Sequence, residues 1–190
     1  HTALWISSWT GNTAIISLLI EEMKRTLDED TIRYIVNKCD ITDSTPLRNA
    51  VKLGYNKAVE LMLDYAEIKM ADRDGNTLLH LAVSDNNLHC VKMLKEKGAD
   101  IFHTNNKGLS CIEMAFELAD TNVFDELVRD LEVEKIQSHV DQDGDRLMHK
   151  VVRAGNSYYL IKLLNLGVSK NDLNNKRESP LDIAKIMKNE

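Results

Sequence analysis

Short apolar segments alternate with polar turns along the 190-residue chain. At the start, the apolar stretches 3–9 and 14–20 are separated by G-N-T at 11–13, which predicts two short helices around a turn. Three later turns carry residues that suit the left-handed backbone between two helices: Gly54, Asn86 and Gly155. The pattern therefore predicts an all-α chain made of short helix pairs.

One six-residue phrase returns along the chain at a nearly constant interval. It reads T-P-L-R-N-A from Thr45, T-L-L-H-L-A from Thr77, S-C-I-E-M-A from Ser110, R-L-M-H-K-V from Arg146 and S-P-L-D-I-A from Ser179. The steps are 32, 33, 36 and 33 residues, and an earlier copy, T-A-L-W-I-S, starts at Thr2. Such a period is the sequence signature of stacked repeats.

A period near 33 with the phrase T-P-L-H-x-A resembles the ankyrin repeat, a β-turn followed by two antiparallel helices. Residues 90–101 and 159–169 look like the family's second helix, and 36–47 looks like its finger hairpin, with Asp43 where the family has glycine. The resemblance implies an ankyrin-repeat solenoid of helix-turn-helix pairs with β-turn fingers, forming one domain over 1–190. The repeats implied are 1–39 (with an insertion near 21–35), 40–71, 72–104, 105–140, 141–173 and a partial 174–190.

Each residue type in the phrase has a physical role. The Thr or Ser hydroxyl can accept from free N–H groups at the start of the first helix. Proline is tolerated at the first helical position, where its missing donor is not needed. Leucine and alanine at helical spacing face the neighbouring repeat. The resemblance implies that the histidine, here His80 and His149, ties the turn to its neighbours by hydrogen bonds.

The first repeat carries about ten extra residues. Leu27, Ile32, Ile35 and Val36 are spaced to lie on one face of a lengthened or additional helix, with Asp28 or Asp30 near its start. Two interpretations remain open, a binding feature and a tolerated surface insertion. We favour the surface insertion.

The stretch D-Q-D-G-D-R-L-M-H-K (141–150) raises the question of a calcium loop or an acid–base site. An EF-hand needs glycine at its sixth position and glutamate at its twelfth, and counting from Asp141 these are Arg146 and Val152. The same stretch matches D-R-D-G-N-T-L-L-H-L (72–81) in register. We therefore expect this stretch to have a structural role, with Asp141 and Asp143 at an exposed hairpin tip.

No other motif indicates catalysis. His89 and Cys90 are neighbours on a predicted helix and point roughly 100° apart, a poor arrangement for a nucleophile and its base. The histidines fall in different repeats without metal-ligand spacing, and nucleotide-binding glycine motifs are absent from the sequence. We expect no enzymatic activity, no catalytic residue, no metal site and no cofactor.

Net charge and cysteine content limit the partners and the cellular compartment that we expect for the chain. The net charge of −6 argues against direct nucleic-acid binding and against anionic membranes, and the broken apolar start argues against membrane insertion. Three cysteines without a C-x-x-C pair suit a reducing compartment, the cytoplasm or nucleus, or the host cytosol for a microbial effector. Because the chain starts without methionine, we expect it to be part of a longer chain. We also expect the domain to be monomeric.

A stack of such repeats presents an extended concave surface, a common binding face of repeat architectures. The resemblance implies that this surface is built from finger tips and the exposed side of the first helices, and the first finger contributes Ile41, Thr42 and Ser44. Trp9 stands out, because buried tryptophans dominate interface hot spots; the alternative is that it packs on an upstream repeat or under the insertion. The predicted partner-binding residues are Trp9, Lys52, Arg73, Asn76, Asp85, Lys107, Leu109, Glu117, Asp143, Asp145 and Arg153.

Three functional hypotheses follow. The first is a non-catalytic module that binds a protein partner through its fingers and inner helices. The second is a targeting or regulatory segment of a larger enzyme, channel or microbial effector protein. The third is a purely structural spacer between other domains. Because one fold serves many functions, the sequence does not name the partner.

Overall fold

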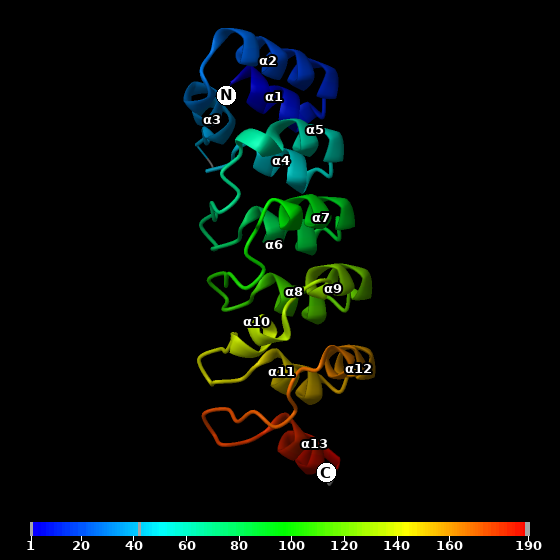
Figure 1. Cartoon of the computed structure of the whole chain (residues 1–190). Coiled ribbons are helices and arrows are strands. Elements are labelled where there is room, and N and C mark those ends of the chain that lie inside the picture. Colours follow the sequence, from blue (N-terminus) through cyan, green and yellow to red (C-terminus); the bar gives the residue numbers. More distant parts are fainter. Residues whose placement is uncertain (1, 42, 189–190) are drawn as a thin grey trace. The chain divides into compact units, whose positions relative to one another are not determined.

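The computed structural model describes residues 2–41 and 43–188, so the predicted finger position Thr42 lies outside the described residues. The chain divides into two compact units, His1–Ala115 (unit 1) and Phe116–Glu190 (unit 2). The described residues form thirteen α-helices and one 3₁₀ turn and contain no strand, only an isolated bridge between Thr104 and Ser110. The all-α ankyrin-repeat prediction is confirmed (Figure 1). The prediction of a single domain over 1–190 stays a prediction.

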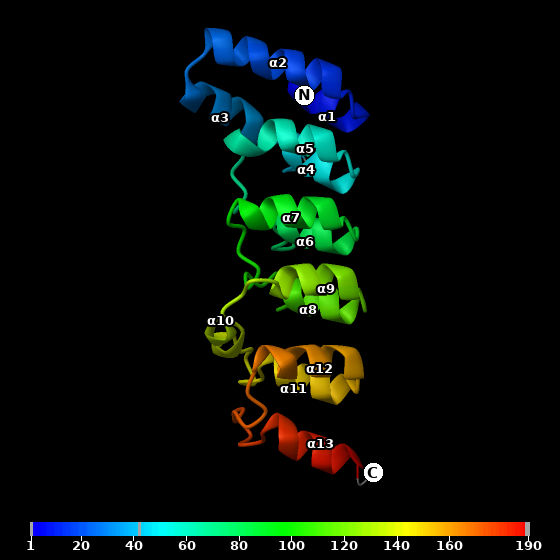
Figure 2. The same cartoon turned by 45° about the vertical axis from the view of Figure 1, so that its right-hand side comes forward.

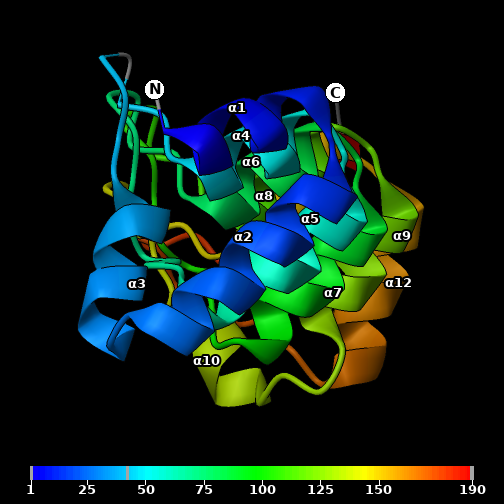
Figure 3. The same ribbon diagram turned by 90° about the horizontal axis from the view of Figure 1, so that it is seen from above.

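Unit 1 consists of successive helix pairs that lie in two rows. Figure 3 shows α1, α4 and α6 one behind another, with α2, α5 and α7 in a second row beside them. The buried core between the rows is aliphatic, as at Ile16, Val59 and Leu94. The helices are α1 (Ala3–Thr10), α2 (Thr13–Thr26), α3 (Glu29–Asn37), α4 (Pro46–Lys52), α5 (Asn56–Met62), η1 (Leu63–Tyr65), α6 (Leu78–Ser84) and α7 (Leu88–Glu96), and α8 (Cys111–Glu117) contains the boundary with unit 2.

Unit 2 contains one helix pair and three further helices (Figure 2). Tyr159 is fully buried at its centre, where its ring meets Phe124 and Phe116 edge to face at centroid distances of 4.7 and 5.1 Å. The helices are α9 (Thr121–Val128), α10 (Val133–Ser138), α11 (Leu147–Ala154), α12 (Ser157–Leu166) and α13 (Pro180–Lys188). None of the helices in the described ranges combines the length and apolarity needed to cross a membrane.

The helix starts follow the roles predicted from the phrase. The hydroxyls of Thr2, Thr45 and Ser179 accept the N–H three residues on, at 3.1 Å in each case. Pro46 and Pro180 occupy the first positions of α4 and α13. Side-chain caps of this kind satisfy donors that the first helical turn leaves free.

The turns between paired helices use positive φ angles as predicted. Gly54, Asn86 and Gly155 have φ of 72°, 52° and 65°. Ala119 occupies the same turn after α8 with φ of 56°, a conformation that costs a residue with a Cβ about 1–2 kcal/mol. The left-handed turn is therefore set by the architecture even where glycine is missing.

The insertion in the first repeat forms the additional helix α3. Asp28 caps it by accepting the Thr31 N–H at 2.9 Å, and Ile32 and Val36 are buried. Leu27 is the C-terminal cap of α2, is extended and is exposed, so the prediction that it shares a helix face with Ile32 and Val36 was wrong. Asn37 at the end of α3 donates to the Tyr65 carbonyl at 2.8 Å, which ties the insertion to the second repeat.

The longer fourth repeat is explained by α10, a short helix that the sequence pattern did not predict. Ile136 is its buried residue. The carbonyl of Gln137 within α10 accepts a hydrogen bond from Arg146 Nε at 2.7 Å. The extra residues therefore form a packed segment that leads into the next finger.

Candidate functional site

The five fingers share one hydrogen-bonding pattern, and it answers the question raised by residues 141–150. In the finger 141–145, the Asp141 carboxylate accepts the main-chain N–H groups of Asp143 and Asp145 at 3.0 and 2.9 Å, and the Asp141 N–H donates to the Asp145 carbonyl at 3.0 Å. Asp72 and Asn105 cap their own fingers in the same way. The carboxylate therefore shapes a turn, which is a structural role as predicted. Asp141 was expected at an exposed tip but is half-buried, whereas Asp143 is exposed.

In each unit, one pair of successive fingers is held together by an asparagine. The Asn106 N–H donates to the Asp74 carbonyl at 2.9 Å, and its side-chain amide donates to the Arg73 carbonyl at 2.8 Å. Asn175 makes the same pair of bonds to Asp143 and Gln142, at 3.0 and 3.1 Å. These bonds fix the finger tips at the spacing of the repeat.

The first and second fingers of unit 1 use a different contact. Asp43 stands where the other fingers of this unit have glycine, and its carboxylate accepts Arg73 Nε at 2.7 Å. This ion pair is exposed at both ends, and such pairs contribute only about 0–1 kcal/mol. The Arg73 side chain stays 74% exposed while it makes this contact, so it can also reach a partner.

In two repeats, a histidine at the fourth position of the phrase ties the first helix to the next finger. His80 Nδ1 accepts the Thr77 N–H at 3.3 Å, so its proton lies on Nε2, which donates to the Leu109 carbonyl at 3.1 Å. His149 bonds in the same way to Glu178 at 3.1 Å. The structural role implied for both histidines is confirmed.

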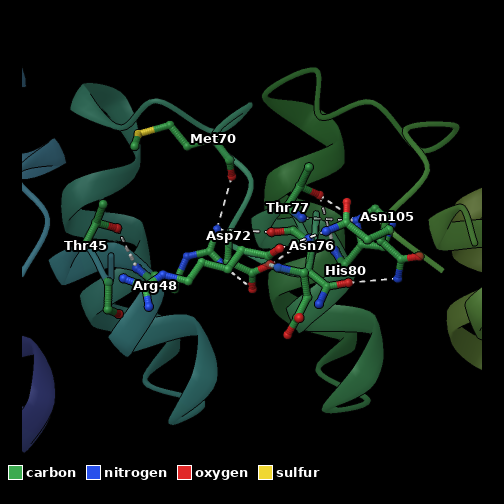
Figure 4. Close-up of polar contacts among 12 residues, drawn as sticks. Thr45, Arg48, Met70, Asp72, Asn76, Thr77, His80 and Asn105 are labelled. Atoms are coloured by element: carbon green, nitrogen blue, oxygen red, sulfur yellow. Dashed lines mark hydrogen bonds and ion pairs between the residues drawn. The ribbon is translucent and has the colours of Figure 1, made fainter. Parts of the chain in front are cut away.

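In the first two repeats other donors replace this histidine. Trp5 Nε1 donates to the Ser44 carbonyl at 3.3 Å. Arg48 Nη2 donates to the carbonyls of Asn76 and Met70, at 3.2 and 3.1 Å, and Nη1 pairs with Asp72 at 3.0 Å (Figure 4). Burial lowers the pKa of Arg48, and the negative charge of Asp72 opposes this effect.

A cleft of about 570 Å³ opens between the first two fingers and helices α1 and α4 of unit 1. Its apolar wall is formed by Trp5 and Trp9, whose rings stack at 5.6 Å with an interplanar angle of 5°. Ile41 on the finger is 91% exposed and faces the same cleft. Polar residues at the wall include Asn49 and Lys52 from α4.

The predicted binding residues of unit 1 differ in their surroundings. Trp9, 51% exposed, and Lys52 line the cleft, so Trp9 is not covered by the insertion. Arg73 reaches Asp43 at the edge of the cleft. Exposed side chains outside the cleft are Asp85 and Lys107.

Two predicted residues of unit 1 are less exposed than expected. Asn76 is half-buried, and its Oδ1 accepts Asn105 Nδ2 at 2.9 Å. Leu109 was expected to be exposed, but it is also half-buried, because its main chain closes the finger and accepts from His80. Both residues help to build the turn that presents their neighbours.

In unit 2, Asp145 departs furthest from its predicted place. It was expected at an exposed finger position but is 5% exposed. Its carboxylate pairs with Arg153 and accepts Asn174 Nδ2 at 2.8 Å. Arg153 is thereby drawn into the same network, while Asp143 and Glu117 are exposed.

The sequence reasoning did not select Trp5, Asn49 or Leu81, which the structure places at the cleft. One signal was available, since Trp5 occupies the fourth position of the first phrase, T-A-L-W. A tryptophan aligned with a structural histidine indicates a position beside the next finger. Asn49 and Leu81 follow one residue after that position in their own repeats.

The residues considered for chemistry do not converge. Cys90 Sγ lies 3.2 Å from Asn56 Oδ1, whereas His89 Nε2 lies 3.2 Å from Glu60, so the two side chains have separate partners. Glu113, in place of a histidine, accepts the N–H and hydroxyl of Ser110 at 2.9 and 2.7 Å and caps its helix. Within the described ranges, no three His, Cys, Asp or Glu side chains are grouped to hold a metal ion.

Thiol modification is expected to distinguish the three cysteines. Burial raises the pKa of all three thiols, that of Cys90 to about 11 and that of Cys111 further, but Cys39 is only half-buried and therefore more accessible to a reagent. Because the thiolate is the reactive form, a disulfide reagent at pH 8 should modify Cys39 rapidly and the other two only after denaturation. Peptide mapping of the modified chain measures this, and rapid modification of Cys111 in the folded chain would contradict it.

The stability of the folded chain is expected to fall as the pH drops through about 6.5. Burial lowers the pKa of His80 below its ordinary value of 6.5. The unfolded state then binds the proton first, so the contribution of neutral His80 is complete above this pH and is lost below it. Urea midpoints at pH 7.5 and 5.5 should differ less for His80→Gln than for the unmodified chain; equal differences would contradict the prediction.

Comparison with known proteins agrees with this architecture. The family model for ankyrin repeats in three copies matches residues 23–105. A putative ankyrin repeat protein of fowlpox virus is 30% identical over 78% of this chain and 46% of its own length. A palmitoyltransferase of Candida glabrata is 29% identical over 70% of this chain and 17% of its own length. The chain thus spans less than half the length of these curated relatives.

Solved structures give the same result for the fold. The ankyrin repeat domain of Bcl-3 superposes with a TM-score of 0.70, covers 99% of this chain and 98% of that domain, and is 19% identical. The chain belongs to the ankyrin-repeat family.

Proposed function

We propose that the chain is a non-catalytic module that binds a protein partner through its finger tips and first helices. Ankyrin repeats serve as protein-interaction modules, and the fold is generally non-catalytic. The observation that carries the proposal is the half-exposed Trp9 beside the cleft of unit 1. An exposed tryptophan on a rigid helix is the kind of residue that dominates interface energies.

The remaining predicted residues support this surface to different degrees. Lys52, Arg73, Asp85 and Lys107 in unit 1 present exposed charged side chains, and Glu117 and Asp143 do so in unit 2. Asn76, Leu109, Asp145 and Arg153 serve mainly to hold fingers and helices together. We therefore place the binding residues mainly among the first group.

Affinity purification with the 190-residue chain tests the proposal. The probe is compared with a triple alanine variant at Trp9, Arg73 and Lys107. A matched variant carries alanine at three exposed residues outside the cleft, namely Tyr34, Lys57 and Lys97. A protein retained by the unmodified chain and the matched variant but lost by the first variant supports the proposal. Equal retention by all three chains, or by none, would refute it.

A second function is favoured by the match to part of an enzyme. The chain resembles 17% of the length of a palmitoyltransferase, so the segment can be a targeting or regulatory part of a larger protein. In that case, removing it from the full-length protein should change location or regulation while leaving the catalytic step itself intact. Loss of the catalytic step in a correctly folded deletion variant would argue against this role.

A further inference from the structure

The polar groups on the finger side of the unit 1 cleft are already engaged. Asp43 accepts Arg73 Nε at 2.7 Å, and Asp72 pairs with Arg48 at 3.0 Å. Asp40 Oδ1 accepts the main-chain N–H four residues on, at 2.9 Å. The carboxylates of this wall are therefore committed within the unit and are poorly placed to attract a cation.

The helix side of the cleft offers hydrogen-bond donors instead. Lys52 is exposed and makes no ion pair within the part of the chain that the structure describes; it interacts with Asp85 only at longer range. Asn49 is 3% exposed, and its Oδ1 accepts from Ser44 Oγ at 2.8 Å. Its Nδ2 has no partner among the described residues. Both donors lie on α4, one helical turn apart.

The apolar part of the cleft suits one bulky side chain. Trp9 is covered on one face by Trp5 and is half exposed. Ile41 projects from the finger with almost no protein contact. A long aliphatic or aromatic side chain between Trp9 and Ile41 would remove both surfaces from water, which is favourable in proportion to the buried apolar area.

We infer that this cleft binds an extended segment of a protein partner that carries a bulky apolar residue with an aspartate or glutamate close to it in sequence. The apolar side chain contacts Trp9 and Ile41, and the carboxylate pairs with Lys52. A main-chain carbonyl of the segment accepts from Asn49. The inference rests on the proposed function. It specifies the chemistry of the partner because the helix side of the cleft offers donors, at Lys52 and Asn49, while the carboxylates of the finger side are already engaged.

A library of random dodecapeptides provides the probe. The chain's two tryptophans both line the cleft, so intrinsic tryptophan fluorescence reports on this site alone. Selected peptides should carry a bulky apolar residue within about three positions of an acid, roughly 10 Å along an extended strand. Their synthetic forms should shift or quench the fluorescence in a saturable manner.

Labelled-peptide binding then separates the two interactions. Trp9→Ala should weaken binding by about 30-fold or more, and Lys52→Glu by about 10-fold. Replacing the acid of the peptide by its amide should weaken binding to the unmodified chain but not to Lys52→Glu. Tyr34→Ala and Lys57→Glu, both exposed outside the cleft, should leave binding unchanged.

Other outcomes overturn the inference. Enrichment of basic peptides, failure to enrich any peptide that depends on Trp9, or equal binding by Lys52→Glu would each do so. Peptides whose binding is lost with Arg73 and Lys107 but not with Trp9 and Lys52 would leave the proposed function standing and remove only this cleft. If the proposed function itself is wrong, retention of a partner should not change when any of these residues is substituted.

Discussion

Gly75→Ala is expected to lower the free energy of unfolding by about 3 kcal/mol. Gly75 has φ of 76°, and a Cβ added there would lie 2.8 Å from the Asn106 nitrogen and 2.7 Å from its Oδ1. The Asn106 N–H bonds to the Asp74 carbonyl at 2.9 Å, so the added methyl group must push the two fingers apart. Urea denaturation followed by circular dichroism measures the change.

Gly98→Ala is the matched control for this substitution. Gly98 lies in the same unit with φ of 81°, but an added Cβ would meet nothing within 4 Å. Its replacement should lower the free energy of unfolding only by the cost of placing alanine in a left-handed backbone conformation, about 1–2 kcal/mol. Equal losses at Gly75 and Gly98 would mean that the contact between fingers does not matter for stability.

Arg48→Ala is expected to destabilise the chain by about 3 kcal/mol, because it breaks a largely buried ion pair. The guanidinium donates to Asp72 and to the carbonyls of Met70 and Asn76, and its removal deprives each of these acceptors of one donor (Figure 4). The loss is measured by the shift of the urea midpoint. Asp72→Asn and the double variant complete a double-mutant cycle, which isolates the interaction between the two side chains.

Arg48→His should recover most of this loss. Histidine at the same position of the phrase donates to the carbonyl before the next Thr or Ser, as His80 and His149 do. The expected residual loss is about 1 kcal/mol, because histidine replaces the hydrogen bond to the carbonyl but only part of the ion pair with Asp72. A histidine variant no more stable than the alanine variant would show that the arginine contributes more than this single bond.

The repeat and its hydrogen bonds could be predicted from sequence because they depend on local chemistry at a fixed period. The caps at Thr45 and Ser179, the positive φ angles and the role of His80 all recur in register. Of the two acids expected near the start of the additional helix, Asp28 is the N-terminal cap of α3. These features need only short-range geometry, which the phrase itself encodes.

The contacts that differ between repeats could not be predicted in this way. Asp145 occupies a finger position that is exposed by register, but Arg153 and Asn174 enclose its carboxylate. Arg48 and Trp5 reach carbonyls 28 and 39 residues away, and the length and direction of such side chains are not set by spacing. The helix α10 was missed because six residues carry too little periodicity to be distinguished from a loop.

The candidate cleft was only partly predictable for the same reason. Trp9 and Lys52 were found from their register, since variable positions of the first helix are exposed in this family. The stacking of Trp5 on Trp9 and the unmet donor of Asn49 depend on how α1, α4 and the first finger pack together. Sequence spacing identified the surface, and packing determines its chemistry.

The carbonyl that receives a donor from the preceding repeat has a consequence for engineering. In the first, second, third and fifth phrases, indole, guanidinium or imidazole groups all reach the same type of acceptor. The junction therefore requires an N–H of sufficient reach and not one residue type. Repeats exchanged between ankyrin proteins should join productively whenever the incoming module keeps that acceptor in place, which widens the set of chimeras that can be assembled without redesigning the seam.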